Sequence, residues 1–138
     1  MSRKPHAIVL DSWAIMAYLE DEPGGDIVSD AIADAHEEDI PLLMSVLNVG
    51  EVWYVIARET ATADAETAVA QLRQLGIEFI AADWHLAKEA ARYKAKHKMS
   101  YADCFAAALT KQKDAVLLTG DPQFHQIERE IRITWLRK

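Results

Sequence analysis

The sequence predicts an α/β fold, a three-layer α/β/α sandwich whose central, mainly parallel sheet has about five strands. Short apolar runs alternate with longer segments of helical periodicity from one end of the chain to the other. Such alternation is typical of parallel sheets with helices on both faces, because the chain must cross back between parallel strands. A second observation concerns Asp11 and Asp121, which directly follow two of the apolar runs. Residues so placed lie at the carboxyl edge of a parallel sheet, where open α/β folds have their functional sites.

Five segments have the composition of short buried strands, and helical segments fill the intervals between them. Ser45 and Asp83 are suitable N-caps, since their side chains can accept hydrogen bonds from backbone N–H groups. Gly76 suits the left-handed position that ends a helix, and Pro122 can open a short one. The predicted strands are residues 7–10, 41–44, 77–81, 115–120 and 131–136. The predicted helices, caps included, are residues 12–20, 26–37, 45–59, 64–75, 83–96 and 102–111.

The composition predicts a single domain, residues 1–138. Hydrophobic residues make up 51% of the chain and charged residues 27%, a balance that excludes an intrinsically disordered protein. No apolar run approaches the roughly 20 residues of a membrane-spanning helix, and residues 7–10 are too short for a signal-peptide core. The single cysteine, Cys104, excludes an internal disulfide and suits a reducing compartment. We therefore expect a cytoplasmic protein without a membrane segment.

The net charge of −7 is distributed unevenly along the chain. Residues 11–40 contain ten acidic side chains and no Lys or Arg, whereas residues 88–113 contain seven basic side chains and two acidic ones. Local fields rather than total charge guide a polyanion, so the sequence remains compatible with an RNA partner. The same cations could instead solvate a helix end. The candidate RNA-binding residues are Arg92, Lys94, Lys96 and Lys98.

Four acidic residues, Asp11, Glu51, Asp103 and Asp121, are candidates for one shared site. Glu51 lies in a mostly apolar helix, and Asp103 opens an Ala-rich helix that must pack deep in the domain. Ionised side chains in such places are seldom buried unless they are paired or bind a cation. The four carboxylates would repel one another without a cation between them, and all-oxygen ligand sets favour Mg²⁺ or Mn²⁺. The pattern therefore favours a metal-dependent phosphodiesterase.

Each acid also has an ordinary structural interpretation. Asp11 could simply cap the following helix, and Glu51 could pair with Arg58 on an exposed face two turns along. Asp103 could be a helix-start acid stabilised by the helix dipole. Asp121 could belong to a common Asp-Pro turn. One acid alone is a weak signal, so the prediction of a shared site depends on all four.

Four short segments occur in the order and approximate spacing of one known family. On these segments the chain resembles the PIN-domain ribonucleases, and in particular the VapC-type toxins of toxin–antitoxin pairs. The resemblance extends over nearly the whole chain, and all four acidic positions of the family are occupied. The segments are Ile8-Val9-Leu10-Asp11-Ser12, then Ser45 with Glu51-Val52, then Ala102-Asp103-Cys104-Phe105-Ala106-Ala107-Ala108, and finally Leu117-Leu118-Thr119-Gly120-Asp121-Pro122-Gln123-Phe124.

The resemblance implies a parallel five-stranded sheet between helices, a homodimer, and an endoribonuclease that uses Mg²⁺, with Mn²⁺ as a substitute. It further implies that RNA cleavage inhibits translation and that the tail of a cognate antitoxin blocks the site. The residues so implied are Asp11, Glu51, Asp103 and Asp121 as catalytic groups and metal ligands, with Ser12 and Thr119 as supporting hydroxyls.

Two other enzyme or signalling classes share a parallel α/β fold with an acid at a strand tip. A receiver-like phosphoacceptor domain without nuclease activity is the alternative, but such domains have adjacent acids there and Asp11 is followed by Ser12. A haloacid-dehalogenase-like phosphatase requires a second Asp two residues further on, where this chain has Trp13. Phosphorylation by acetyl phosphate would distinguish the receiver from the nuclease.

Several other residues are more simply explained by structure than by function. Trp13, Trp53 and Tyr54 could stack on RNA bases, although their helical spacing favours packing in the core or in a dimer interface. Cys104 is typical of a small buried side chain in an Ala-rich helix. The five histidines show no shared short spacing suited to zinc.

Overall fold

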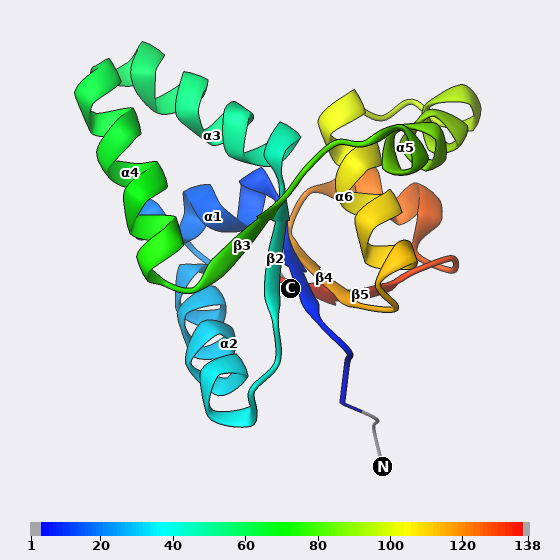
Figure 1. The fold of residues 1–138 in the computed structure, drawn as a ribbon, viewed down its shortest axis with the longest axis horizontal. Coiled ribbons are helices and arrows are strands. Elements are labelled where there is room, and N and C mark those ends of the chain that lie inside the picture. The colour runs from blue at the N-terminus through cyan, green and yellow to red at the C-terminus, as the bar shows by residue number, and fades with distance from the viewer. Residues whose placement is uncertain (1–3, 137–138) are drawn as a thin grey trace.

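The computed structural model describes residues 4–136 and has a central sheet of five parallel strands in the order β3-β2-β1-β4-β5 (Figure 1). The predicted sheet is therefore confirmed, with strand ends that differ by at most one residue from those expected. The strands are β1 (Ile8–Leu10), β2 (Leu42–Ser45), β3 (Ile77–Ile80), β4 (Val116–Thr119) and β5 (Arg132–Trp135).

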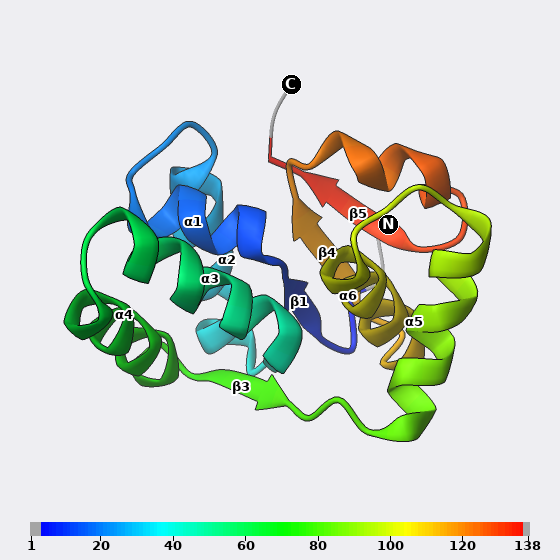
Figure 2. The same ribbon diagram turned by 90° about the horizontal axis from the view of Figure 1, so that it is seen from above.

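Helices cover both faces of this sheet, as predicted. Figure 2 shows α1 to α4 on one side and α5, α6 and the 3₁₀ helix η1 on the other. Within residues 4–136, no helix is long and apolar enough to cross a membrane. The helices are α1 (Ser12–Leu19), α2 (Gly25–Glu38), α3 (Val46–Glu59), α4 (Thr62–Gln74), α5 (Trp84–Lys96), α6 (Tyr101–Gln112) and η1 (Pro122–Ile127).

The two layers of helices bury two separate hydrophobic clusters against the sheet. Ile8 and Leu10 of β1 pack with α1, α2 and α3, whereas Val9 between them packs with α5 and α6. This alternation follows from the pleat, which points successive side chains to opposite faces. Strands buried on both faces are apolar at every position, which explains why they appear in the sequence as continuous apolar runs.

The predicted caps are confirmed at both ends of the helices. Ser45 ends β2 and caps α3, where its Oγ accepts a hydrogen bond of 3.2 Å from the backbone N–H of Leu47. Asp83 caps α5 by accepting from the N–H of Leu86 at 2.9 Å. Gly76, directly after the C-cap of α4, has a φ of 83°, a conformation that side chains with a Cβ rarely adopt. Because α1 and α3 directly follow β1 and β2, their amino ends lie at the carboxyl edge of the sheet.

The loop between α5 and α6 is fixed from two sides. Lys94 extends its ammonium group to the carbonyl oxygen of Met99 at 2.6 Å. The Gln126 side chain pairs with the backbone of Lys98, accepting from its N–H at 3.2 Å and donating to its carbonyl at 3.1 Å. These contacts hold in place the first turn of α6, which carries Asp103.

Candidate active site

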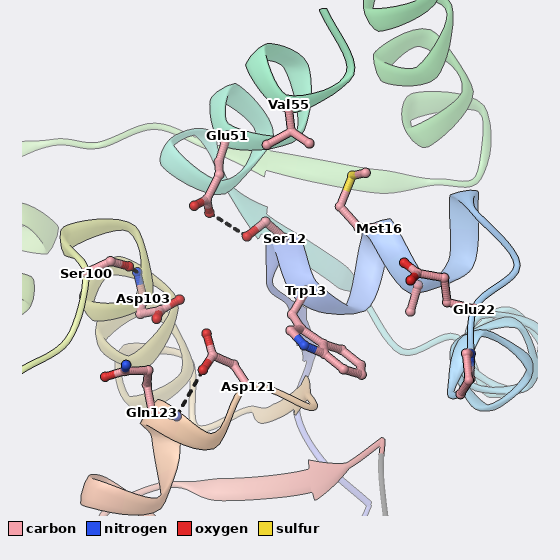
Figure 3. Close-up of a pocket in the computed structure, with 12 residues that line it drawn as sticks. Ser12, Trp13, Met16, Glu22, Glu51, Val55, Ser100, Asp103, Asp121 and Gln123 are labelled. Carbon is pink, nitrogen blue, oxygen red and sulfur yellow. Dashed lines mark hydrogen bonds between the residues drawn. The ribbon is translucent and has the colours of Figure 1, made fainter. Parts of the chain in front are cut away.

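A cleft of about 830 Å³ opens at the carboxyl edge of the sheet, between α1 and α3 on one side and α6 and η1 on the other (Figure 3). Glu51, Asp103 and Asp121 all line it, together with Ser12. These residues come from four distant parts of the sequence. The fold therefore brings the candidate acids to one place.

Asp11 is fully buried beneath the cleft, at the end of β1. Its Oδ1 accepts a hydrogen bond of 2.8 Å from the backbone N–H of Ala14, and its Oδ2 accepts one of 2.5 Å from the hydroxyl of Thr119. Asp11 therefore caps α1, as the simpler interpretation held. Its second oxygen nevertheless belongs to the network of acids and hydroxyls, so the two interpretations hold together.

Thr119 connects Asp11 with Asp121. It is the last residue of β4, is fully buried, and lies beside β1 because the two strands pair in parallel. Its hydroxyl donates to Asp11 and accepts a hydrogen bond of 3.0 Å from the backbone N–H of Asp121. Both hydrogen-bonding roles of the hydroxyl are used, which fixes the positions of two candidate acids relative to each other.

Glu51 lies on the cleft wall formed by α3, where its carboxylate accepts a hydrogen bond from the hydroxyl of Ser12 (Figure 3). The alternative interpretation paired Glu51 with Arg58. Arg58 instead lies over the ring of Tyr54, 5.0 Å from its centre. The structure thus places Glu51 beside the residue that follows Asp11.

Asp103 and Asp121 extend toward one another from α6 and from the turn before η1 (Figure 3). Ser100 caps α6, since its Oγ accepts from the backbone N–H of Asp103 at 3.1 Å. Asp121 caps η1 by accepting from the N–H of Gln123 at 2.9 Å. Asp103 is buried and Asp121 is half-buried. The cap of η1 therefore fixes the Asp121 carboxylate, and the cap of α6 fixes the first helical turn, which carries Asp103.

The buried acids are hard to ionise in the protein alone. Burial raises the pKa of Asp11 to about 8, and the charges of Asp103 and Asp121 add to that effect, while the hydrogen bonds from Thr119 and Ala14 oppose it. Burial likewise raises the pKa of Asp103 to about 7, with further contributions from the charges of Asp121 and Glu51. The acids act on one another electrostatically, so the cleft concentrates negative charge that a cation would relieve.

The donor set fits a hard divalent cation that retains some of its water. Among residues 4–136, the lining of the cleft includes no Lys, Arg or His that would neutralise the acids. In the same part of the chain, no three Asp, Glu, His or Cys side chains close around a single point. An open cluster of carboxylates suits Mg²⁺, which is commonly held by one or two carboxylates and several waters.

The predicted RNA-binding cations lie outside the cleft, and two of them have partners within the chain. Lys94 donates to Met99 as described above, and Arg92 forms an ion pair of 3.3 Å with Glu89. Lys96, the last residue of α5, and Lys98, in the loop that follows, are both exposed. A role of these cations in RNA binding remains a prediction.

Three further cleft residues were not singled out as site residues by sequence reasoning. Ser100 and Gln123 line the cleft beside the acids, and in the sequence they lie three residues before Asp103 and two residues after Asp121. Trp13, for which core or dimer packing was the favoured interpretation, lines the cleft as well. The sequence feature that indicates a cleft position for Trp13 is its place in the first helical turn after Asp11, at the carboxyl edge of the sheet.

The fold and the cleft define an open parallel α/β protein with a cluster of carboxylates at the carboxyl edge of its sheet. The chain belongs to the PIN-domain family, whose model matches residues 8–130. Membership in this family disfavours the receiver-like alternative. A comparison with curated protein sequences gave no match.

Solved structures of similar fold include several VapC toxins. VapC20 of Mycobacterium tuberculosis, a sarcin–ricin loop cleaving toxin, has a TM-score of 0.68 at 17% identity over 87% of this chain and 94% of its own. DNA-bound VapBC of Salmonella typhimurium gives a TM-score of 0.75 at 15% identity over 95% and 98% of the two chains. A toxin–antitoxin complex of Klebsiella pneumoniae gives 0.67 at 13% identity over 96% and 99%. At these identities the likeness concerns the fold.

Proposed function

We propose that this PIN-domain protein is a metal-dependent endoribonuclease that hydrolyses RNA phosphodiester bonds. The observation that carries the proposal is a cleft lined by Glu51, Asp103 and Asp121, with Asp11 buried beneath it and, among residues 4–136, no Lys, Arg or His in its lining. A phosphodiester is itself anionic and would not enter such a cleft unless its charge were offset. The same site would therefore need a divalent ion both to offset the repulsion among its acids and to receive its substrate.

Each residue of this site would have a distinct role. Asp11 and Asp103 would be the principal ligands of Mg²⁺ or Mn²⁺, with Glu51 and Asp121 completing the shell directly or through water. A bound ion of this kind activates water for in-line attack and stabilises the charge that develops on the phosphate. Thr119 holds Asp11 by its hydroxyl, and Ser12 does the same for Glu51. Such hydrogen bonds around the ligands set their orientation before any ion arrives.

The biological role that fits is that of a toxin whose RNA cleavage inhibits translation in the cytoplasm. Support comes from proteins of similar fold, one an RNA-cleaving toxin and another a toxin–antitoxin complex. We accordingly propose a cognate antitoxin and a homodimer as the partners of this chain.

Expression of the protein in cells, followed by sequencing of RNA 5′ ends, tests the activity. Wild type should produce new 5′ ends that Asp11→Asn and Asp103→Asn do not produce. Asp30→Asn, which alters an exposed acid of α2, serves as the matched control and should cut like wild type. With purified protein, EDTA should stop cleavage and Mg²⁺ or Mn²⁺ should restore it. Undiminished cleavage by the EDTA-treated protein would contradict metal dependence.

A further inference from the structure

The cleft has a second half that the acids do not explain. Met16 and Val55 line the part of the cleft away from Asp103 and Asp121, with Val55 one turn beyond Glu51 on α3 (Figure 3). Ala17 and Pro23 are apolar residues of the same lining. Both halves belong to one continuous cleft. A substrate whose phosphate lies over the carboxylates would therefore place its neighbouring groups against an apolar wall.

The indole of Trp13 is held in this wall by a specific contact with Gly120. A Cβ at position 120 would stand 2.3 Å from Cη2 of the indole, 2.5 Å from Cζ3 and 2.6 Å from Cζ2. Three consecutive ring atoms at nearly equal distance indicate an approach to the ring face, since an approach to the edge would leave two of them clearly further away. Gly120 therefore lets the ring lie flat against the backbone between β4 and η1.

A ring fixed in this way is a ready platform for stacking. Its position is set in advance, so little side-chain freedom is given up when a ligand packs on it. Nucleic-acid bases stack on aromatic side chains, and every base has a face suited to such contact. The apolar half carries no Lys, Arg or His among residues 4–136, so it would not bind a phosphate. The carboxylate of Glu22 at its rim can accept hydrogen bonds from the N–H groups at a base edge.

We infer that the apolar half of the cleft is a subsite for one unpaired nucleobase, which stacks on Trp13 while the adjoining phosphate lies over the carboxylates. The inference rests on the proposed ribonuclease activity and adds to it Trp13 as the residue that binds the base beside the scissile bond. A base paired within a helix is covered by its neighbours and cannot reach this wall. The preferred substrate is therefore RNA in which a nucleotide next to the scissile bond is unpaired, as in a loop or single strand.

The test uses a short single-stranded RNA that contains a cleavage site mapped with the wild-type protein. Trp13→Ala should lower kcat/KM by about 10- to 100-fold, which is the range expected for one stacked base. Trp13→Phe keeps an aromatic face and should retain most of the activity. Trp84→Ala removes a tryptophan that is 74% exposed and outside the cleft, and it should cleave like wild type.

Two further measurements separate stacking from a general loss of structure. RNA with an abasic nucleotide on one side of the scissile bond should be cut by wild type as slowly as intact RNA is cut by Trp13→Ala, and the mutation should then have little further effect. Gly120→Ala should also slow cleavage, because its methyl group would displace the indole. The double variant Trp13→Ala/Gly120→Ala should match Trp13→Ala within about twofold, as expected for two changes that act on one contact.

The outcomes distinguish this inference from the function on which it rests. Wild-type protein that cleaves no RNA would overturn the proposed function and the subsite with it. Normal wild-type cleavage of intact RNA would overturn the subsite alone if Trp13→Ala cut intact RNA, and wild type cut abasic RNA, at that same undiminished rate. Unchanged cleavage by Trp13→Ala with weakened inhibition by its antitoxin would also overturn it, since the apolar half would then bind a protein segment.

Discussion

The hydroxyl of Thr119 and the carboxylate of Asp11, which are 108 positions apart in the sequence, are joined by a buried hydrogen bond of 2.5 Å. The bond forms because β1 and β4 are neighbours in the sheet and Leu10 pairs with Leu118 directly before both residues. A single hydroxyl thereby links the two central strands at the candidate site.

Loss of this hydroxyl should harm both stability and activity. Thr119→Val keeps the shape of the side chain but leaves Asp11 Oδ2 and the N–H of Asp121 without their partner. An unsatisfied buried polar group costs about 1–3 kcal/mol, so the free energy of unfolding should fall by that amount. RNA cleavage should fall as well, since Asp11 loses its orientation. Thr119→Ser restores the hydroxyl and should recover most of both properties, as urea unfolding and initial cleavage rates would show.

Removal of the charge at Asp11 should stabilise the metal-free protein in a pH-dependent way. The pKa of Asp11 is raised in the folded protein from 3.8 to about 8, so the unfolded chain releases this proton more readily than the folded one. Wild-type stability therefore falls as pH rises from about 4 to about 8, and the loss is complete above that range. Asp11→Asn has no proton to lose there.

Urea unfolding in EDTA at about pH 4 and about pH 8.5 measures this difference. Asp11→Asn should resemble wild type at the lower pH and exceed it by on the order of a few kcal/mol at the higher one. The exposed control Asp30→Asn should show no such pH dependence. An advantage of the same size at both pH values would contradict the assignment of the effect to ionisation.

Metal affinity should rise with pH through neutrality. Asp103 and Asp11 have pKa values of about 7 and about 8 in the absence of metal, so below neutrality an ion must displace their protons before it can bind. Between about pH 6 and pH 8, Mn²⁺ affinity should increase by about tenfold per pH unit for each proton displaced, then level off. Calorimetry in two buffers of different ionisation enthalpy counts the protons released. Affinity that is constant from pH 6 to 8 would exclude both acids as ligands.

The salt dependence of RNA binding should locate the cations that hold the substrate. Lys96→Ala/Lys98→Ala should lower the slope of log affinity against log salt by about 1.4, because each cation that neutralises a phosphate of single-stranded RNA adds about 0.7 to that slope. Lys94 is kept in this variant because its ammonium group supports the loop at Met99. Metal affinity should not change, since no candidate ligand is altered.

The matched control replaces Lys111 and Lys113, which lie at the end of α6 remote from Asp103. Wild-type slopes in the Lys96/Lys98 variant, together with a lower slope in this control, would place the RNA along the other end of that helix. Binding measured on the Asp103→Asn background prevents cleavage during the titration.

The sequence allowed the strands and the candidate acids to be predicted because both depend on local pattern. A strand buried on both faces is a continuous apolar run, and the residue after it must lie at the carboxyl edge, which located Asp11 and Asp121. Glu51 and Asp103 required a further step, namely that a carboxylate in an apolar helix needs a partner. The resemblance to a known family, in which the same four segments occur in the same order, indicated that the four acids belong to one site.

Other features depended on contacts between distant residues and could not be predicted. The order of strands in the sheet is set by pairing and has no local signal. The place of Trp13 in the cleft depends on the missing side chain of Gly120, far away in the sequence. The sequence likewise suggests that Lys94 is a solvated cation, whereas its ammonium group donates a hydrogen bond to Met99 and stabilises the loop before α6. Spacing along one helix contains none of this information.

Asp11 and Asp121 follow the first and the fourth strands of the chain, and β4, which ends at Thr119, comes later in the sequence than β2, the other neighbour of β1. A nascent chain therefore lacks Asp121, and the Thr119 hydroxyl that holds Asp11, until its ribosome has translated β4 and the turn into η1. Under the proposed function, the growing polypeptide would not cleave RNA before that point, because its set of candidate metal ligands would be incomplete.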